Sequence, residues 1–241
     1  MTINTQLPLA IAIPDYARFD NFYAGSNSEL LSQLKKISVG DGKESLYLWG
    51  GTGQGKSHLL QASCVAARQQ GQNANYLSLQ QLKGCSPGIL QGYDEADLLC
   101  LDDLQLIVGD PEWEEAVFHL YNRLLERSAL LVVAASKAPD ALGLQLADLT
   151  SRLSWGLVYG LNRMDDEDRL AALTLRAQQR GLELAEDAGR YLLRHHARDL
   201  RALFGFLDAL DHASMVEQRR LTLPFVRDVL INRDPWEKPE T

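Results

Sequence analysis

The stretch "GGTGQGKSH", Gly50 to His58, decides the fold of this chain. It matches the pattern G-x-x-x-x-G-K-[ST] and directly follows the apolar run "SLYLW" of residues 45–49. In such a loop the backbone N–H groups surround phosphates, the lysine reaches the β- and γ-phosphate oxygens, and the hydroxyl holds Mg²⁺. A strand, this loop and a helix that begins near Lys56 therefore predict a phosphate site. Its residues are Gly50, Gly51, Thr52, Gly53, Gln54, Gly55, Lys56, Ser57 and His58.

After this loop, short apolar runs alternate with stretches whose apolar residues recur at helical spacing. The other runs are at 73–79, 96–104, 129–136 and 155–161. This alternation predicts an α/β fold, a parallel five-stranded sheet with helices on both faces. After Asn162 the pattern is helical only, which predicts a small C-terminal all-helical lid. We expect an extended arm at 1–14, a nucleotide-binding domain at 15–162, the lid at 163–235 and a tail at 236–241.

Composition restricts the partners and the compartment. The formal net charge of the 241 residues is −8, whereas proteins that grip duplex DNA alone usually carry a basic footprint. We therefore expect DNA contact only indirectly, through partners. No apolar run is long enough to span a bilayer and no signal peptide is visible, which predicts a cytoplasmic protein without a membrane partner. Cys64, Cys85 and Cys100 lack C-x-x-C spacing and are expected to be buried, reduced thiols.

Two acids follow the strand predicted within 96–104. Proteins with a phosphate loop place an acid at a neighbouring strand end to hold Mg²⁺, and often a second one to orient a water molecule. We assign Asp102 to the metal, together with Ser57. For Asp103, a catalytic role in orienting water and a solvated turn are equally good interpretations. Ser136 ends the next strand, where it could contact the γ-phosphate or simply cap the strand.

Three arginines are candidates for contact with a nucleotide. Arg152 lies in "LTSRLSWGL", just before the last predicted strand. It could pair with a local acid such as Asp148, or project as a finger toward a neighbour's phosphate. Arg198 and Arg201 lie on a predicted lid helix and one of them could fold back onto the nucleotide. From the residues alone, surface solvation is the default for all three.

Six stretches, taken together, carry a family resemblance: "FDNF" (19–22), "GGTGQGKSHLLQA" (50–62), "LLCLDDLQ" (98–105), "ASKAP" (135–139), "LTSRLSWGLVYGL" (149–161) and "RDLRALFGFLDALD" (198–211). They resemble the AAA+ ATPases of the initiator class, the bacterial DnaA family, from about residue 18 to residue 232. The resemblance implies ADP or ATP with Mg²⁺ as cofactor, with the diphosphate form active. It implies that Ser136 is the first sensor and Arg201 the second. Arg152 would be an arginine finger acting in trans, and Phe19 and Phe22 would surround the base.

Both ends of the chain depart from this family. DnaA proteins carry a helix-turn-helix domain after the lid and a long domain before the AAA+ module, and we expect neither here. The arm contains "QLPLAI" instead, which is similar to the Q-L-x-L-x-[LI] peptide that docks on the replicative sliding clamp. Pro8 and Ala10 depart from the commoner form of this peptide. The residues expected to enter the clamp are Gln6, Leu7, Leu9 and Ile11.

The resemblance therefore implies a regulatory adaptor that stimulates ATP hydrolysis by DnaA on the DNA-loaded clamp and prevents re-initiation of replication. Its own ATPase would be weak, and a homo-oligomer is possible because AAA+ sites form between neighbours. One alternative is an ATP-driven helicase loader or DNA-remodelling ATPase, which predicts robust hydrolysis stimulated by DNA. A second is a permanently held nucleotide with an inert arm, which predicts no response to the clamp.

Overall fold

The computed structural model describes residues 17–195, 200–217 and 221–232. The chain divides into two compact units, residues 1–162 and 163–241, which we describe separately. The predicted arm with its four clamp-binding residues, the tail at 236–241 and Arg198 lie outside the described residues.

The first unit is built on a parallel sheet, as predicted. Its five strands follow the spatial order β2-β3-β4-β1-β5, and every pair of neighbours is parallel. All carboxyl ends therefore meet at one edge of the sheet, the edge where α/β proteins bind ligands. The strands are β1 (Leu46–Trp49), β2 (Ala74–Ser78), β3 (Leu98–Asp102), β4 (Leu130–Ala135) and β5 (Leu157–Gly160).

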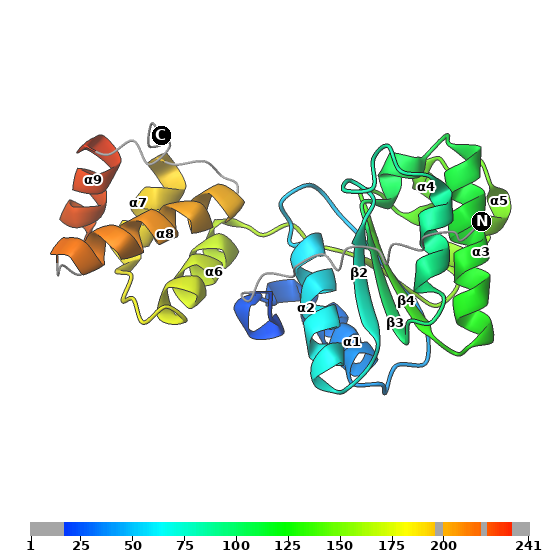
Figure 1. Ribbon diagram of the computed structural model, residues 1–241. Coiled ribbons are helices and arrows are strands. Elements are labelled where there is room, and N and C mark those ends of the chain that lie inside the picture. Colours follow the sequence, from blue (N-terminus) through cyan, green and yellow to red (C-terminus); the bar gives the residue numbers. More distant parts are fainter. Residues whose placement is uncertain (1–16, 196–199, 218–220, 233–241) are drawn as a thin grey trace, which may run out of the picture. The chain divides into compact units, whose positions relative to one another are not determined.

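Helices cover both faces of this sheet (Figure 1). Side chains alternate along each strand, so Leu46 and Leu48 enter the core cluster on one face and Tyr47 enters the cluster on the other. The first cluster packs against α1 (Ser28–Ser38) and α2 (Lys56–Gln69). The second cluster packs against α3 (Pro111–Glu126), α4 (Pro139–Leu142) and α5 (Ala147–Ser154).

Helix α3 follows its sequence signals closely. Pro111 is its first residue, and the Asp110 carboxylate accepts a hydrogen bond from the Trp113 N–H at 3.3 Å. The helical spacing of its apolar residues predicts that Val117, Leu120, Tyr121, Leu124 and Leu125 face the core, and the first four are buried. The same prediction for Leu125 is wrong, because it is 49% exposed. Leu125 lies one residue beyond the buried Leu124, which turns its side chain about 100° away around the helix.

The second unit is the all-helical lid that the sequence predicts. It contains α6 (Asp166–Gln178), α7 (Glu186–His195), α8 (Leu200–Glu217) and α9 (Leu223–Asn232). Asp165 and Asp168 form a capping box at the start of α6. Arg190 of α7 pairs with Glu167 at 2.8 Å, which ties α7 to α6. The lid has its own core, which includes Leu173, Leu192, Phe206, Leu210 and Phe225.

The cysteine prediction needs one correction. Cys64 and Cys100 are buried free thiols, as expected, but Cys85 is exposed. Cys85 follows Gly84 in a turn after β2, where the chain runs over the surface.

None of the helices in the described part of the chain is long and apolar enough to cross a membrane.

Candidate nucleotide-binding site

The phosphate loop leaves β1 at Gly50 and enters α2 at Lys56. Gly53 and Gly55 have φ angles of +78° and +92°, in the left-handed region that favours glycine. A Cβ on Gly55 would also come within 2.8 Å of the Phe22 ring, so both backbone and space require glycine there. Thr52 is exposed in the middle of the loop. The Gly50 N–H donates to the Ala135 carbonyl at 3.2 Å, which fixes the start of the loop beside the end of β4.

The amino end of α2 offers free N–H groups and partial positive charge to an anion. The first N–H groups of a helix have no acceptor within it, and the helix dipole places partial positive charge there. A phosphate at the amino end of a helix is stabilised by both effects.

Lys56 supplies the mobile charge of the loop. Its Nζ donates to the carbonyl oxygens of Gly50 and Gly51, at 2.8 Å each. Burial lowers the pKa of Lys56, while the negative charges of Asp102 and Asp103 act in the opposite direction. The ammonium group is therefore folded across its own loop, and a bound phosphate would compete with these two carbonyls for it.

Asp102 is fixed by hydrogen bonds at the end of β3. Its side chain is buried, and its Oδ2 accepts a hydrogen bond from the Tyr76 hydroxyl at 2.8 Å. Its Oδ1 accepts the Asp103 N–H at 2.9 Å. Burial raises the pKa of Asp102, and hydrogen bonds from Ser57 and Tyr76 oppose the rise. Tyr76 is not among the residues predicted for this site, although a tyrosine in the predicted strand at 73–79, which precedes the strand that carries the two acids, is a signal that could have identified it.

Ser57 and Asp102 are the two residues predicted to hold Mg²⁺, and they lie in contact. A hydroxyl and a carboxylate side by side are suitable, because Mg²⁺ prefers oxygen ligands and keeps several waters. Among the residues that the structure describes, no group of three or more His, Cys, Asp or Glu side chains offers an alternative metal site. The pair therefore fits a magnesium ion that is also held by nucleotide phosphates.

Asp103 and Ser136 occupy the same edge of the sheet. Asp103 has a left-handed φ of +64°, and its carboxylate accepts hydrogen bonds from Gln105 at 3.1 Å and Ser78 at 3.4 Å. Ser136 is exposed directly after β4, the strand between β3 and β1. It therefore follows a strand whose neighbours end at Asp102 and at the phosphate loop. The catalytic role of Asp103 and the sensor role of Ser136 remain predictions.

The two phenylalanine rings predicted to surround the nucleotide base belong to the core beneath the phosphate loop. Phe19 and Phe22 are both 9% exposed and join the cluster formed by α1 and α2. Phe22 stacks on His58 with ring centroids 6.1 Å apart. The His58 Nε2 lies 2.9 Å from the Arg18 carbonyl oxygen, which ties the 3₁₀ turn Phe19–Asn21 to α2. The contact of Phe19 and Phe22 with a base stays a prediction.

Gln54 of the phosphate loop is half-buried, and its Oε1 is buried without a hydrogen-bond partner.

Arg152 lies at the opposite edge of the sheet from the phosphate loop. It belongs to the last turn of α5, and the chain that follows joins the sheet where the Leu157 N–H donates to the Ser45 carbonyl at 3.1 Å. Ser45 precedes β1, whereas the loop follows it, and four strand residues span about 13 Å. The structure therefore does not bring Arg152 to its own chain's phosphate loop. Arg201 falls in α8, but its side chain lies outside the described part of the structure.

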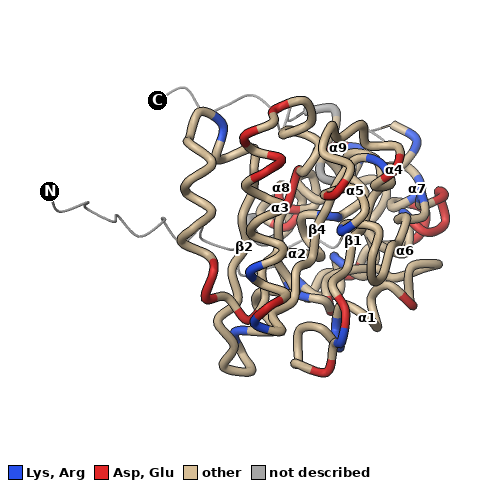
Figure 2. The backbone as a smooth tube through the Cα atoms, turned by 90° about the vertical axis from the view of Figure 1, so that its right-hand side faces the viewer, with Lys and Arg blue, Asp and Glu red and all other residues tan. Residues whose placement is uncertain are grey.

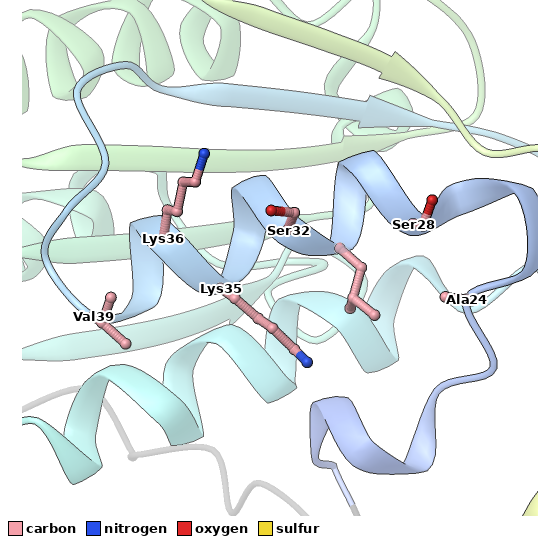
Figure 3. A pocket seen from close by; sticks show the side chains of 7 residues that line it. Ala24, Ser28, Ser32, Lys35, Lys36 and Val39 are labelled. Atoms are coloured by element: carbon pink, nitrogen blue, oxygen red, sulfur yellow. The ribbon is translucent and has the colours of Figure 1, made fainter.

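Two hollows lie beside α1. The larger, of about 450 Å³, opens on α1 (Figure 3). The smaller, of about 230 Å³, lies between α1 and α2. No residue of the phosphate loop lines either hollow. The larger is lined by Ala24, Ser28, Leu31, Ser32, Lys35, Lys36 and Val39.

Charged residues of both signs are interspersed along the described backbone (Figure 2).

The parallel sheet, the phosphate loop and the helical lid define an AAA+ nucleotide-binding fold. The family model of the bacterial DnaA ATPase domain matches residues 14–160, and that of the Hda lid domain matches residues 166–230. This chain belongs to the bacterial DnaA ATPase family and carries a lid of the Hda type.

Solved structures share the fold at low sequence identity. Domain III of the Thermotoga maritima initiator DnaA is 22% identical, with a TM-score of 0.77, over 94% of this chain and 100% of that one. AMPPCP-bound DnaA from Aquifex aeolicus is 24% identical, with a TM-score of 0.69, over 86% and 70% of the two chains. The Holliday junction branch migration motor RuvB of T. maritima is 15% identical, with a TM-score of 0.66, over 90% and 75%. These likenesses support the predicted fold.

Proposed function

We propose that this protein is a nucleotide-bound regulatory adaptor. It docks on the DNA-loaded sliding clamp and stimulates ATP hydrolysis by the initiator DnaA, which prevents re-initiation of chromosome replication. The observation that carries the proposal is the position of Arg152, which is half-buried at the edge of the sheet away from its own phosphate loop. An arginine so placed serves a neighbour's nucleotide better than its own.

The adaptor holds ADP or ATP with Mg²⁺. Backbone N–H groups of Gly53–Ser57 and Lys56 bind the phosphates, while Ser57 and Asp102 hold the ion. The ion would neutralise phosphate charge when bound. The folded-back Lys56 and the hydrogen-bonded Asp102 support this assignment. Solved DnaA relatives have been described with AMPPCP, an ATP analogue. The diphosphate serves here as a fixed ligand or switch that orders the fold.

Arg152 is the arginine finger that the adaptor supplies in trans. Its guanidinium stabilises charge that develops on the γ-phosphate of ATP held by DnaA, and such fingers contribute about 10³–10⁵ in rate. The lid of the Hda type and the ATPase unit of the DnaA type support DnaA as the partner, because AAA+ sites form between related subunits.

The arm supplies the second contact. Gln6, Leu7, Leu9 and Ile11 enter a pocket on the clamp as an extended peptide, which gains affinity from a few anchors. This assignment rests on the sequence of the arm alone.

A reconstituted ATPase assay tests the proposal. ATP-bound DnaA is mixed with DNA-loaded clamp and this protein, and conversion of DnaA-bound ATP to ADP is followed. We expect acceleration that requires the clamp and is lost when Gln6 and Leu7 are both changed to Ala. Absence of stimulation by the wild-type protein, together with a robust intrinsic ATPase stimulated by DNA, would overturn the adaptor and favour a loader or remodelling motor.

A further inference from the structure

Trp155 is an exposed aromatic side chain next to the proposed finger. It is 57% exposed, the largest fraction among the exposed large hydrophobic side chains of the described residues. Isolated surface hydrophobics are common and need no explanation by themselves. Trp155 differs because the guanidinium of Arg152 lies over its ring, 4.5 Å from the ring centroid.

The main chain is fixed on both sides of Trp155. The Trp155 N–H donates to the Arg152 carbonyl at 3.1 Å and closes the last turn of α5. Gly156 follows with a φ of +84°, and a Cβ there would come within 2.6 Å of the Ser45 carbonyl oxygen. The Leu157 N–H then donates to that same carbonyl. The backbone of Trp155 is therefore held three residues after Arg152 by a turn that favours glycine, so the ring projects from a fixed point of the chain.

The guanidinium lies over the Trp155 ring and forms no ion pair with a carboxylate of the described residues. Asp148, the acid that the sequence offered as a partner, makes no ion pair with Arg152 in the described part of the chain. The charge of Arg152 also reaches Tyr121, where it opposes the rise in the Tyr121 pKa that burial causes. A cation–π contact engages no carboxylate, so the N–H donors of the guanidinium can still bind phosphate oxygens.

We propose that Trp155 is a positioning residue that holds Arg152 ready to reach the nucleotide of a neighbouring AAA+ subunit. This inference rests on the proposed function. A long arginine side chain loses rotamer freedom when it becomes fixed, and a ring that fixes it beforehand reduces that loss in the transition state. Trp155 itself need not touch the nucleotide or the partner.

The contact is tested without any partner. In an ¹⁵N–¹H correlation spectrum each of the four Trp indoles gives one N–H resonance, and that of Trp155 is the one lost in Trp155→Phe. We expect Arg152→Ala to move the Trp155 resonance and to leave those of Trp49 and Trp113, which lie elsewhere, in place. A Trp155 resonance that does not move would overturn the contact and the inference with it.

The consequence is tested in the DnaA ATPase assay. We expect Trp155→Leu to lower the maximal stimulated rate about two- to fivefold, the range for an exposed cation–π contact. The protein concentration for half-maximal stimulation should stay unchanged. Trp155→Tyr, which keeps an aromatic face, should retain most of the rate. In the Arg152→Ala background, Trp155→Leu should have no further effect. The melting temperature with ADP serves as the folding control.

The results separate this inference from the proposed function. If wild-type protein stimulates DnaA and Arg152→Ala does not, the function stands. A normal maximal rate for Trp155→Leu then overturns the positioning role, and so does a change confined to the half-maximal concentration, which would identify a docking contact instead. If wild-type protein fails to stimulate at all, the function is wrong and the positioning role falls with it, whatever the spectrum shows.

Discussion

Tyr76→Phe is the sharpest probe of the metal end of the site. The change removes one hydroxyl and keeps the ring, so packing in β2 is preserved. The lost hydroxyl donates at 2.8 Å to the Asp102 carboxylate, and both side chains are buried. A buried acceptor left without its donor costs about 1–3 kcal/mol, and the cost lies toward the upper end when the acceptor is charged. We therefore expect the free energy of unfolding to fall by about 2–3 kcal/mol in the absence of nucleotide.

The same change should weaken magnesium binding, because Tyr76 orients the carboxylate proposed as its ligand. Loss of such a supporting hydrogen bond typically weakens metal affinity about 10- to 100-fold. Urea unfolding followed by circular dichroism measures the first effect, and calorimetric titration of Mg²⁺ into the ADP-bound protein measures the second.

Tyr47→Phe is the matched control. The Tyr47 hydroxyl donates at the same distance, 2.8 Å, but to the neutral Lys137 carbonyl. We expect a smaller loss of about 1 kcal/mol in stability, and no change in Mg²⁺ affinity. If the two variants lose equal stability and bind Mg²⁺ equally well, the reasoning about Asp102 is refuted.

Three further substitutions test other parts of the structure. Lys56→Ala removes the mobile charge at the phosphates, so it should abolish the rise in melting temperature that excess ADP gives the wild-type protein; an unchanged rise would contradict the assignment. Glu114→Ala should cost about 3 kcal/mol in urea unfolding, because the buried carboxylate accepts the N–H groups of Gly109, Gln145 and Leu146 at 2.7–2.9 Å, and a loss below about 1 kcal/mol would count against this. Gly55→Ala should destabilise the protein more than Gly71→Ala in thermal melts. Both glycines have a positive φ, but only at position 55 would the added Cβ meet a side chain, the ring of Phe22; equal losses would show that this contact is unimportant.

The sequence predicted those parts of the structure that depend on local pattern. The phosphate loop combines a fixed spacing with an apolar strand before it and a helix after it, so its place in the fold follows directly. The five strands could be predicted from short runs of apolar residues, and the lid from apolar residues that recur at helical spacing. The place of Asp102 at the end of β3 could be predicted because the strand before it is apolar throughout, whereas its role as a metal ligand stays a prediction.

The remaining features depend on contacts between distant segments. Helix α5 has eight residues, too few for its apolar period to stand out, so its orientation and the exposure of Trp155 could not be predicted. The Tyr76–Asp102 hydrogen bond depends on the pairing of β2 with β3, which aligns Ser78 with Asp102. The outward direction of Leu125 depends on where the helix meets the core, because Leu124 already fills the inner face.

The central claim is that Arg152 acts on a nucleotide held by another subunit. It is tested most directly by loading DnaA with labelled ATP and measuring its conversion to ADP on the DNA-loaded clamp with wild-type protein or Arg152→Ala. The account predicts that the variant binds ADP and the clamp as the wild-type protein does, but leaves the ATP on DnaA intact. Arg152→Lys should restore little, because a point charge lacks the planar fork. Undiminished hydrolysis in the presence of folded Arg152→Ala protein would contradict the account.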